Sequence, residues 1–489
     1  MLIANVQING HDGVIDVRCS DGENGGVITQ LGKALSRAGE DCIIDGQEGA
    51  LLAGLHDHHL HLLAYAALCN SVQCGPPLVF SRAELRDELR SACTGGALSD
   101  WLRGVNYHES VAGELNSATL DELVSNRPLK IQHRSGKMWM VNSLAAKLLS
   151  LQEYVGMPGV ELDLAGKPSG RLFRLDAWMR DQVASDDHIV MPSLFMVSQQ
   201  LASYGVTGVT DASPDNSLFA MRHFEACAES GELLQKVRVL GDDDLPESVH
   251  KKVERGERKI LLDENNLPNW DDFYTIVNRA HDTGRGVAVH CVTPVELVLT
   301  LSVLQAAGVH PQDRIEHASL VPEDVMPLLS QTGVRVVTQP GFIYGRGDQY
   351  LQDVPAQQWC DLYRGGQLLA NDIALAGSSD APYGDADPWA AMRAAVDRKT
   401  RGTQVIGAAE ALTPEQALAL FSSAADDPGG VSRAISVGAI ADFCLLDRSW
   451  AEARLRLRSE DVRCTFIGGE LIYQRKKCSA VEERYVSAA

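Results

Sequence analysis

Residues 54–61 read Gly54-Leu55-His56-Asp57-His58-His59-Leu60-His61, a cluster of four histidines at the end of an apolar run. On a strand, side chains two residues apart point the same way, so His59 and His61 can bind one metal ion together. His58 is then expected to face away from that ion. By itself the motif also fits a polar, histidine-rich loop without a ligand, so the rest of the chain has to decide.

Eight short apolar runs fit the strands of one sheet. The first covers residues 51–55, and from about residue 200 onward seven more alternate with stretches long enough for helices. Such alternation is typical of parallel βα units, and eight of them predict an α/β protein with a (β/α)8 TIM-type barrel. The seven later runs lie at 205–210, 236–240, 259–262, 286–290, 314–317, 334–338 and 373–377.

Residues of the kinds found in metal sites recur at these runs. His290 and His317 each end a run and lie 27 residues apart, which fits one βα unit. Lys259 opens a run 31 residues before His290, and Asp380 follows the eighth run, 63 residues after His317. Each alone has an ordinary explanation, such as a core histidine, a solvated lysine or a helix-capping aspartate. Because active sites of these barrels form at the carboxyl ends of strands, the whole set predicts a metal site.

The remaining parts of the chain require elements outside the barrel. About 150 residues separate the first two runs, too many for one crossover, so an insertion is expected at 75–200. Within it we expect a strand at 129–132 and helices at 83–93 and 192–204. Short alternating segments at both ends predict a small composite β-sandwich made of 1–50 and 431–489, with the barrel at 51–430.

Composition narrows the function classes. The 489 residues include 44 Lys and Arg against 65 Asp and Glu, a net charge of −21 that disfavours binding to nucleic acid or to anionic membranes. No long apolar run predicts a membrane span, and the first residues do not resemble a signal peptide. The 11 cysteines are scattered, without a C-x-x-C pair. These features favour a cytoplasmic protein that acts on a small molecule.

In these motifs the chain resembles the amidohydrolase superfamily, in particular the YtcJ-like or amidohydrolase type 3 subgroup. The resemblance covers nearly the whole chain. The stretches that carry it are GLHDHHLHL at 54–62, GVTGVTDAS at 205–213, RKILLD at 258–263, GVAVHCVT at 286–293, RIEHASLVPED at 314–324, VTQPGFI at 337–343, GSSDAP at 377–382, LTPEQALAL at 412–420 and VGAIADFCLLD at 437–447.

The resemblance implies the same barrel, with a sandwich from both termini and an insertion after the first strand. It also implies two divalent ions, with zinc favoured over manganese, cobalt or iron(II). Lysine can bridge two ions only as its CO2-derived carbamate, because an ammonium has no lone pair. The implied ligands are His59, His61 and Asp380 for one ion, His290 and His317 for the other, and carboxylated Lys259 for both.

The two implied ions lead us to expect a hydrolytic reaction. A metal-bridging hydroxide attacks a carbonyl carbon, and Asp380 acts as the catalytic base and then as the acid toward the leaving group. The expected substrate is a small, apolar or aromatic compound with an amide, carbamate or urea-type C–N bond other than a peptide bond. A homodimer is suggested by the family alone. The expected substrate-binding residues are His133 and Arg134, as oxyanion donors, and Trp139, Phe342, Tyr344, Tyr383 and Trp389, as pocket aromatics.

Parts of the sequence depart from the common pattern of the subgroup, and two alternatives stay open. After His290 the chain reads CVTP instead of the frequent H-A-x-G-D type, and the insertion carries HRSGK at 133–137.

A mononuclear deaminase of the same superfamily usually has a glutamate three residues after the His290 position, where this chain has Thr293 and the first glutamate is Glu296. An inactive binding scaffold is the second alternative, although such proteins typically lose metal ligands that this chain keeps.

Overall fold

The chain forms two compact units, and each is described by itself. A computed structural model describes residues 1–20, 25–76, 78–93, 101–175, 178–179, 182 and 191–476. One unit combines Met1–Tyr65 with Leu194–Ala489, and the other is Ala66–Ser193. None of the helices in the described ranges has the length and apolar character needed to cross a membrane.

Eight parallel strands form the centre of the first unit. Past their ends, the N–H of Asp380 donates to the His59 carbonyl and the N–H of His61 to the Ala381 carbonyl, both at 2.8 Å, so the sheet edges meet. The predicted (β/α)8 barrel is therefore confirmed. In sheet order the strands are β19 (Leu375–Gly377), β18 (Arg335–Thr338), β17 (Arg314–His317), β16 (Val287–Cys291), β15 (Val253–Leu261), β14 (Lys236–Gly241), β13 (Val206–Asp211) and β6 (Leu55–Leu60).

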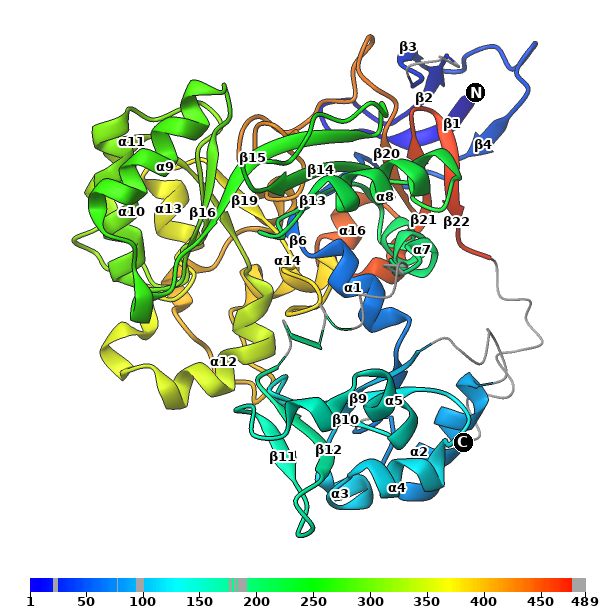
Figure 1. Ribbon diagram of the computed structural model, residues 1–489. Helices are drawn as coiled ribbons and strands as arrows, with labels where there is room; N and C mark the ends of the chain where they lie inside the picture. The colour runs from blue at the N-terminus through cyan, green and yellow to red at the C-terminus, as the bar shows by residue number, and fades with distance from the viewer. Residues whose placement is uncertain are drawn as a thin grey trace. The chain divides into compact units, whose positions relative to one another are not determined.

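Helices follow the strands, and their ends are encoded locally. Before the longest helix, Thr293 and Glu296 form a capping box and Pro294 occupies the first turn, where its missing N–H has no helical partner to lose. Figure 1 shows this helix beside its neighbours α9 and α11, on one side of the barrel unit. The helices of the barrel unit include α7 (Phe195–Ser203), α8 (Leu218–Glu229), α9 (Trp270–Asp282), α10 (Pro294–Ala307), α11 (Met326–Thr332), α12 (Gly341–Asp353), α13 (Gly365–Ala370), α14 (Pro388–Asp397), α15 (Pro414–Ala419) and α16 (Trp450–Ala453).

The first predicted strand, 51–55, is wrong as a barrel strand. Leu51–Ala53 is β5, which pairs with a strand near the C-terminus, and the barrel strand begins at Leu55. Gly54 separates the two elements at a point of close approach. A Cβ there would lie 2.2 Å from the Thr207 side chain, so only glycine fits.

The predicted strand at 259–262 begins too late. β15 starts at Val253, so Lys259 lies near its carboxyl end and not at its head. The sequence pattern did not predict the earlier start because residues 254–258 include four charged side chains, which are unusual inside a barrel strand. These charges are paired in the barrel: Arg238 on β14 binds both Glu254 and Glu257.

Both chain ends form a sandwich of two four-stranded sheets. Ile3, Val17 and Ile28 of the first sheet share one buried core with Phe443 and Phe466 of the second. Figure 1 shows the blue strands beside the red ones. The predicted range 431–489 extends past residue 476, and 477–489 lie outside the described residues. The sheets are β3 (Ile28–Gly32), β2 (Val14–Cys19), β1 (Leu2–Gln7) and β4 (Ile43–Asp45), and β22 (Glu470–Gln474), β21 (Val462–Ile467), β20 (Phe443–Leu446) and β5.

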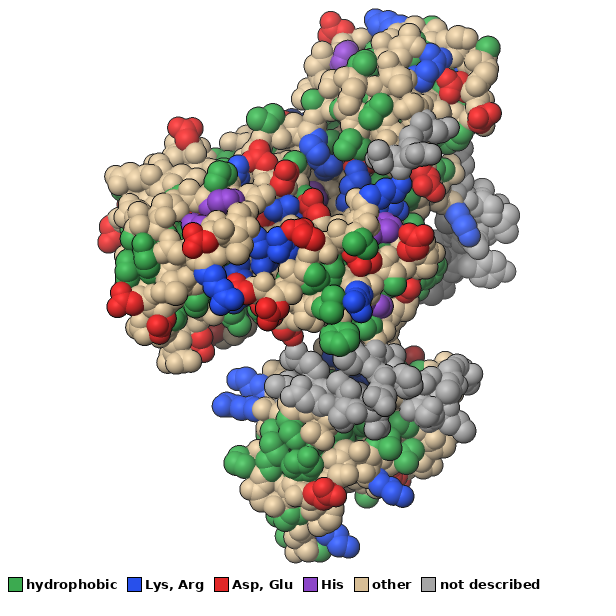
Figure 2. All heavy atoms as spheres, turned by 45° about the horizontal axis from the view of Figure 1, so that its top comes forward, with side chains coloured by type: hydrophobic (Ala, Val, Ile, Leu, Met, Phe, Trp, Pro, Cys, Tyr) green, Lys and Arg blue, Asp and Glu red, His purple; other side chains and the backbone are tan. Residues whose placement is uncertain are grey.

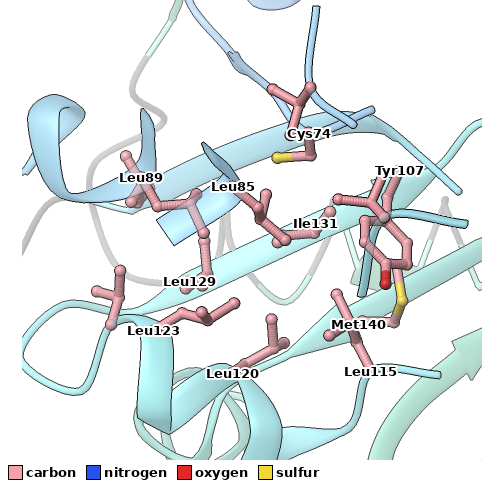
Figure 3. Packing of buried hydrophobic residues seen from close by; sticks show 14 of the residues in the cluster. Cys74, Leu85, Leu89, Tyr107, Leu115, Leu120, Leu123, Leu129, Ile131 and Met140 are labelled. Carbon is pink, nitrogen blue, oxygen red and sulfur yellow. The ribbon is translucent and has the colours of Figure 1, made fainter. Parts of the chain in front are cut away.

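The second unit is a six-stranded sheet covered by short helices. Leu85 and Leu89 of α2 and Leu120 of α4 pack against Leu129 and Ile131 of the sheet (Figure 3). The predicted helix at 192–204 is α7, which belongs to the barrel unit. The strands, in sheet order, are β11 (Val160–Leu162), β12 (Pro168–Phe173), β10 (Met138–Val141), β9 (Leu129–His133), β8 (Leu102–Tyr107) and β7 (Val72–Gln73). The helices include α1 (Leu62–Cys69), which starts in the first unit, α2 (Arg82–Ala92), α3 (Glu109–Ala112), α4 (Ser117–Leu123) and α5 (Ser143–Leu148).

The shared core of the sandwich makes a stability prediction. Phe443 is fully buried between the two terminal sheets, so Phe443→Ala should lower the free energy of unfolding by about 3–5 kcal/mol. Urea unfolding followed by fluorescence measures the change. Val431→Ala, at a residue 89% exposed in the same C-terminal part, is the control and should change stability by no more than about 0.5 kcal/mol. Equal stabilities for the two variants would contradict the shared core.

Candidate metal centre

The predicted ligands gather at one end of the barrel. Each lies on the carboxyl-terminal part of a barrel strand or just past its end, although their positions span more than 300 residues of sequence. Parallel strands bring their carboxyl ends to the same rim, and this explains the convergence. The residues are His59 and His61 at β6, Lys259 in β15, His290 in β16, His317 at the end of β17 and Asp380 after β19.

Three of these residues form a tight group. Single ligand atoms of His59, His61 and Asp380 all lie within 4.8 Å of one another. Asp380 Oδ1 is 3.5 Å from His59 Nε2 and 3.2 Å from His61 Nε2. Nitrogen and oxygen donors at this spacing suit a divalent ion such as zinc, whose bonds to these atoms are about 2.0–2.2 Å long.

The histidine rings are oriented through their Nδ1 atoms. His59 Nδ1 donates to the Glu316 carboxylate, His61 Nδ1 lies 3.1 Å from Ser213 Oγ, and His317 Nδ1 lies 2.7 Å from Gln339 Oε1. A partner at Nδ1 leaves Nε2 as the free donor atom of each ring. The same pattern on three rings matches what metal-binding histidines need.

His290 completes a row of three neighbouring imidazoles that contact one another edge-on or at a tilt. The ring centroids of His290 and His317 are 4.4 Å apart, and those of His317 and His59 are 4.9 Å apart. Burial lowers the pKa of His59 to about 3 and that of His290 to about 4. Both rings are therefore neutral near pH 7, and neutral imidazole is the form that binds metals.

Lys259 is a buried amine beside these rings. Its side chain is 2% exposed, and among the described residues its Nζ has no hydrogen-bond partner. Burial lowers its pKa, which favours the uncharged amine. A buried nitrogen without a partner is costly, and its position among the histidines fits a group that is completed by a metal or by a modification.

The backbone is unusual at two of the ligands. His317 has φ of 71° and Asp380 has φ of 54°, both in the left-handed region. Side chains along a strand alternate, so a turn into this region at the strand end redirects the next side chain. Glu316 and His317 can thus both approach His59, although they are neighbours in sequence. Such strain at non-glycine residues is common in functional sites.

Two buried charges beside the candidate ligands, Glu316 and Arg314, were not among the predicted site residues. Glu316 accepts a hydrogen bond from Arg314 Nε at 2.6 Å and another from His59. Burial alone would raise the pKa of Glu316, but Arg314 and Lys259 outweigh it and hold that pKa well below its usual range. The signal was available in the sequence: Arg-Ile-Glu-His at 314–317 places two charges inside a four-residue strand.

The Asp57 carboxylate links the backbone at His59 to the backbone at Ser379, next to Asp380. Its Oδ1 accepts hydrogen bonds from the N–H of His59 at 3.2 Å and of Ser379 at 3.1 Å. Burial raises the pKa of Asp57 to about 7. The other two histidines of the motif bond elsewhere: His56 Nε2 lies 2.9 Å from Thr210 Oγ1, and His58 Nε2 lies 3.1 Å from Ser423 Oγ.

The predicted pocket aromatics of the barrel unit have different surroundings. Phe342 is buried in an apolar cluster, with the Arg346 guanidinium 4.1 Å from its ring centroid. Tyr344 is 52% exposed, and the Arg401 guanidinium lies 5.7 Å from its ring. Tyr383, 61% exposed, packs edge-on against His61 with ring centroids 5.4 Å apart. Tyr383 therefore lies next to the ligands.

The other predicted substrate-binding residues belong to the second unit. His133 Nε2 lies 3.2 Å from a Glu109 carboxylate oxygen, and its Nδ1 lies 2.7 Å from Ser135 Oγ. Trp139 is buried in a local core, with the Lys130 ammonium 5.6 Å from its ring. The backbone N–H of Arg134 donates to the Tyr107 carbonyl. Substrate contact by His133, Arg134 and Trp139 stays a prediction.

Comparisons with known proteins agree with this geometry. Residues 43–473 match the amidohydrolase family. The chain is 24% identical to an N-substituted formamide deformylase of Arthrobacter pascens, over 88% of this chain and 90% of that one. It is 22% identical to the putative amidohydrolase YtcJ of Bacillus subtilis, over 87% and 89%. An uncharacterized metal-dependent hydrolase from Pyrococcus horikoshii shares the fold, with a TM-score of 0.75 and 20% identity over 94% of this chain and 99% of that one. On its sequence match, the chain belongs to the amidohydrolase family.

Proposed function

We propose that this amidohydrolase uses two divalent ions to hydrolyse a C–N bond of a small amide-type substrate. One observation carries the proposal: the tight group of His59, His61 and Asp380 lies beside a buried lysine amine without a hydrogen-bond partner among the described residues. Ordinary structural roles explain a single buried histidine, but they do not explain this combination of oriented imidazole rings, carboxylate and amine.

The donor set divides into two groups. His59, His61 and Asp380 would hold one ion, and His290 and His317 would hold the other. When bound, the ions would lower the pKa of a water molecule and polarise the substrate carbonyl. Three or more nitrogen and oxygen donors with open positions are typical of catalytic zinc, so zinc is the proposed metal.

Lys259 would join the two groups as a carbamate. Its amine is buried, and the lowered pKa leaves it uncharged and nucleophilic toward CO2. The nitrogen would bond to the CO2 carbon and lose one proton, which gives an anionic carboxylate with two oxygens. The product would turn a partnerless amine into a carboxylate whose oxygens could bind metal ions, and the released proton would pass to water.

Asp380 would move the protons of the reaction. Its Oδ1 has no hydrogen-bond donor among the described residues and faces His59 and His61. A carboxylate so placed can accept the proton of the attacking water and pass it to the nitrogen of the leaving amine. One group then serves as base and as acid, and no net proton is gained or lost on the protein.

The substrate proposal rests on what surrounds the ligands. Tyr383 presents an exposed aromatic ring next to His61, which suits an apolar or aromatic substituent. The relative from Arthrobacter pascens is named for N-substituted formamides. We therefore place N-substituted formamides among the first substrates to test, with other N-acyl amines, carbamates and ureas.

The structure disfavours a mononuclear deaminase. Glu296, the first glutamate after His290, accepts hydrogen bonds from the N–H groups of Val292 and Thr293 at 2.7 and 2.9 Å and caps α10. The Glu296 carboxylate therefore caps the start of α10, and these hydrogen bonds hold it there. Lys259 would also have no role with a single ion. An inactive scaffold has no need for oriented imidazoles and is disfavoured as well.

Metal content tests the proposed two-ion site directly. Purified protein loaded with zinc should hold about two ions per chain by elemental analysis, because two donor groups are present. The same preparation is then screened for release of amine from N-substituted formamides, N-acyl amines, carbamates and ureas. Active protein without stoichiometric metal would refute the proposed function.

Asp380→Asn should keep the fold and lose at least about a hundredfold in turnover, because both proton transfers use this carboxylate. The measurement is kcat at saturating substrate, with metal content determined on the same sample. Asp385→Asn, an exposed carboxylate of the same loop, is the matched control and should keep the wild-type rate. A near wild-type rate for Asp380→Asn with full metal content would place the base elsewhere.

Lys259→Ala should lose the two-ion site and the activity, and a short carboxylic acid such as propionate should restore part of both. The reason is that the added carboxylate can replace the carbamate oxygens in the space left by the side chain. Metal content and rate are measured with and without the acid. Lys399→Ala, at an exposed lysine, serves as control. Two ions bound by Lys259→Ala without added acid would exclude the bridging role.

A further inference from the structure

A cavity lies at the amino-terminal ends of the barrel strands, on the side opposite to the candidate metal ligands. Its volume is about 470 Å³, which is large enough for a small organic ligand. Thr207, Lys236 and Glu254 line it from the first residues of β13, β14 and β15. The segment from Ala424 to Asp442, which leads into β20, lines its other side. The proposed hydrolysis makes no use of this cavity.

The lining is positively charged although the protein as a whole has a net charge of −21. It has five basic residues against three acidic ones. The basic residues are Lys236, Arg238, Lys251, Lys252 and Arg433, and the acidic ones are Glu254, Asp426 and Asp442. In Figure 2, Lys and Arg side chains gather around a hollow of the face that is turned forward. A local excess of cations in an acidic protein attracts anions.

Much of the negative charge in the lining is already neutralised. Asp442 lies between two cations, 2.6 Å from Lys236 Nζ and 3.9 Å from a nitrogen of Arg433. It also accepts a hydrogen bond from the Gly468 N–H. Glu254 binds Arg238 at 2.9 Å, and the same guanidinium also binds the buried Glu257 at 3.1 Å. The third acid, Asp426, is exposed and makes no ion pair with the residues that the structure describes.

Lys252 is the cation that is left over. In the part of the chain that the structure describes, its half-buried ammonium makes no hydrogen bond or ion pair. Burial lowers the pKa of Lys252, and repulsion from Lys251 and Lys236 lowers it further. Attraction by Glu470 acts in the opposite direction. An anion bound between these lysines would relieve the repulsion.

Apolar side chains complete the lining. Val237, Ile435 and Ile440 border the cavity together with the basic groups. Lysine ammonium groups bind phosphate oxygens as point charges, and several of them around one space suit a group with more than one negative charge. We propose that this cavity binds a small organic phosphate, with the phosphate at Lys252, Lys251 and Lys236 and the apolar part against Ile435 and Ile440.

Phenyl phosphate is a suitable probe because it combines both parts. Isothermal titration of the metal-loaded full chain should show binding at submillimolar concentration, whereas uncharged benzyl alcohol should not bind and benzoate should bind more weakly. Lys252→Ala should raise the Kd about tenfold, the effect of one lost charge-assisted hydrogen bond. Lys33→Ala, which removes one exposed positive charge outside the cavity, should leave the Kd unchanged.

A second variant separates this cavity from the metal centre. His61→Asn, at a proposed metal ligand, should keep a phenyl phosphate site with the wild-type Kd. Loss of all binding in His61→Asn would assign the phosphate to the metal centre and overturn the proposal. Absence of binding to the wild-type chain, or equal Kd values for the wild type and Lys252→Ala, would also overturn it.

Discussion

One buried carboxylate connects the interior of the barrel to the candidate metal ligands. Glu316 binds Arg314 and the Nδ1 of His59, and all three side chains are almost fully buried. Arg314 in turn donates to the His58 carbonyl at 2.5 Å. Loss of Glu316 would leave the Arg314 charge buried without compensation and the His59 ring free to turn. The orientation of the first ligand therefore depends on an ion pair inside the barrel.

The same rim of the barrel concentrates strained and partnerless groups. His317 and Asp380 have left-handed backbone conformations, and the Lys259 amine has no hydrogen-bond partner among the described residues. Each costs free energy in the folded state. Close packing around the rim holds these groups in place. The free energy that they cost indicates a role in ligand binding, because they do not stabilise the fold.

The two ends of the barrel differ in charge and in chemistry. At the carboxyl ends, burial lowers the pKa of His59 and of His290, so both rings are neutral and able to bind metals. At the amino ends, Lys236, Arg238 and Lys252 border a cavity in which cations outnumber acids. The side chains that fill such a barrel separate the two regions, so each can bind its own ligand.

The barrel could be predicted from the sequence because strand ends recur at regular intervals, and the candidate ligands His59, His61, His290, His317 and Asp380 fall on these ends. The sequence could not determine which strands pair. Ala53 and Leu55 are both apolar neighbours of Gly54, yet one belongs to the terminal sheet and the other to the barrel. That choice depends on contacts with segments far away in the chain.

Tertiary structure alone decided how the ligands are held and how deep they lie. Glu316 and His59 are 257 residues apart, and no local pattern predicts their hydrogen bond. Lys259 was expected at the head of its strand, but the charged residues before it pair with Arg238 and extend β15 toward the amino end. Spacing along a chain identifies residues that reach the same rim. Burial and pairing, which set the pKa values and the orientation of the side chains there, arise only when distant segments meet.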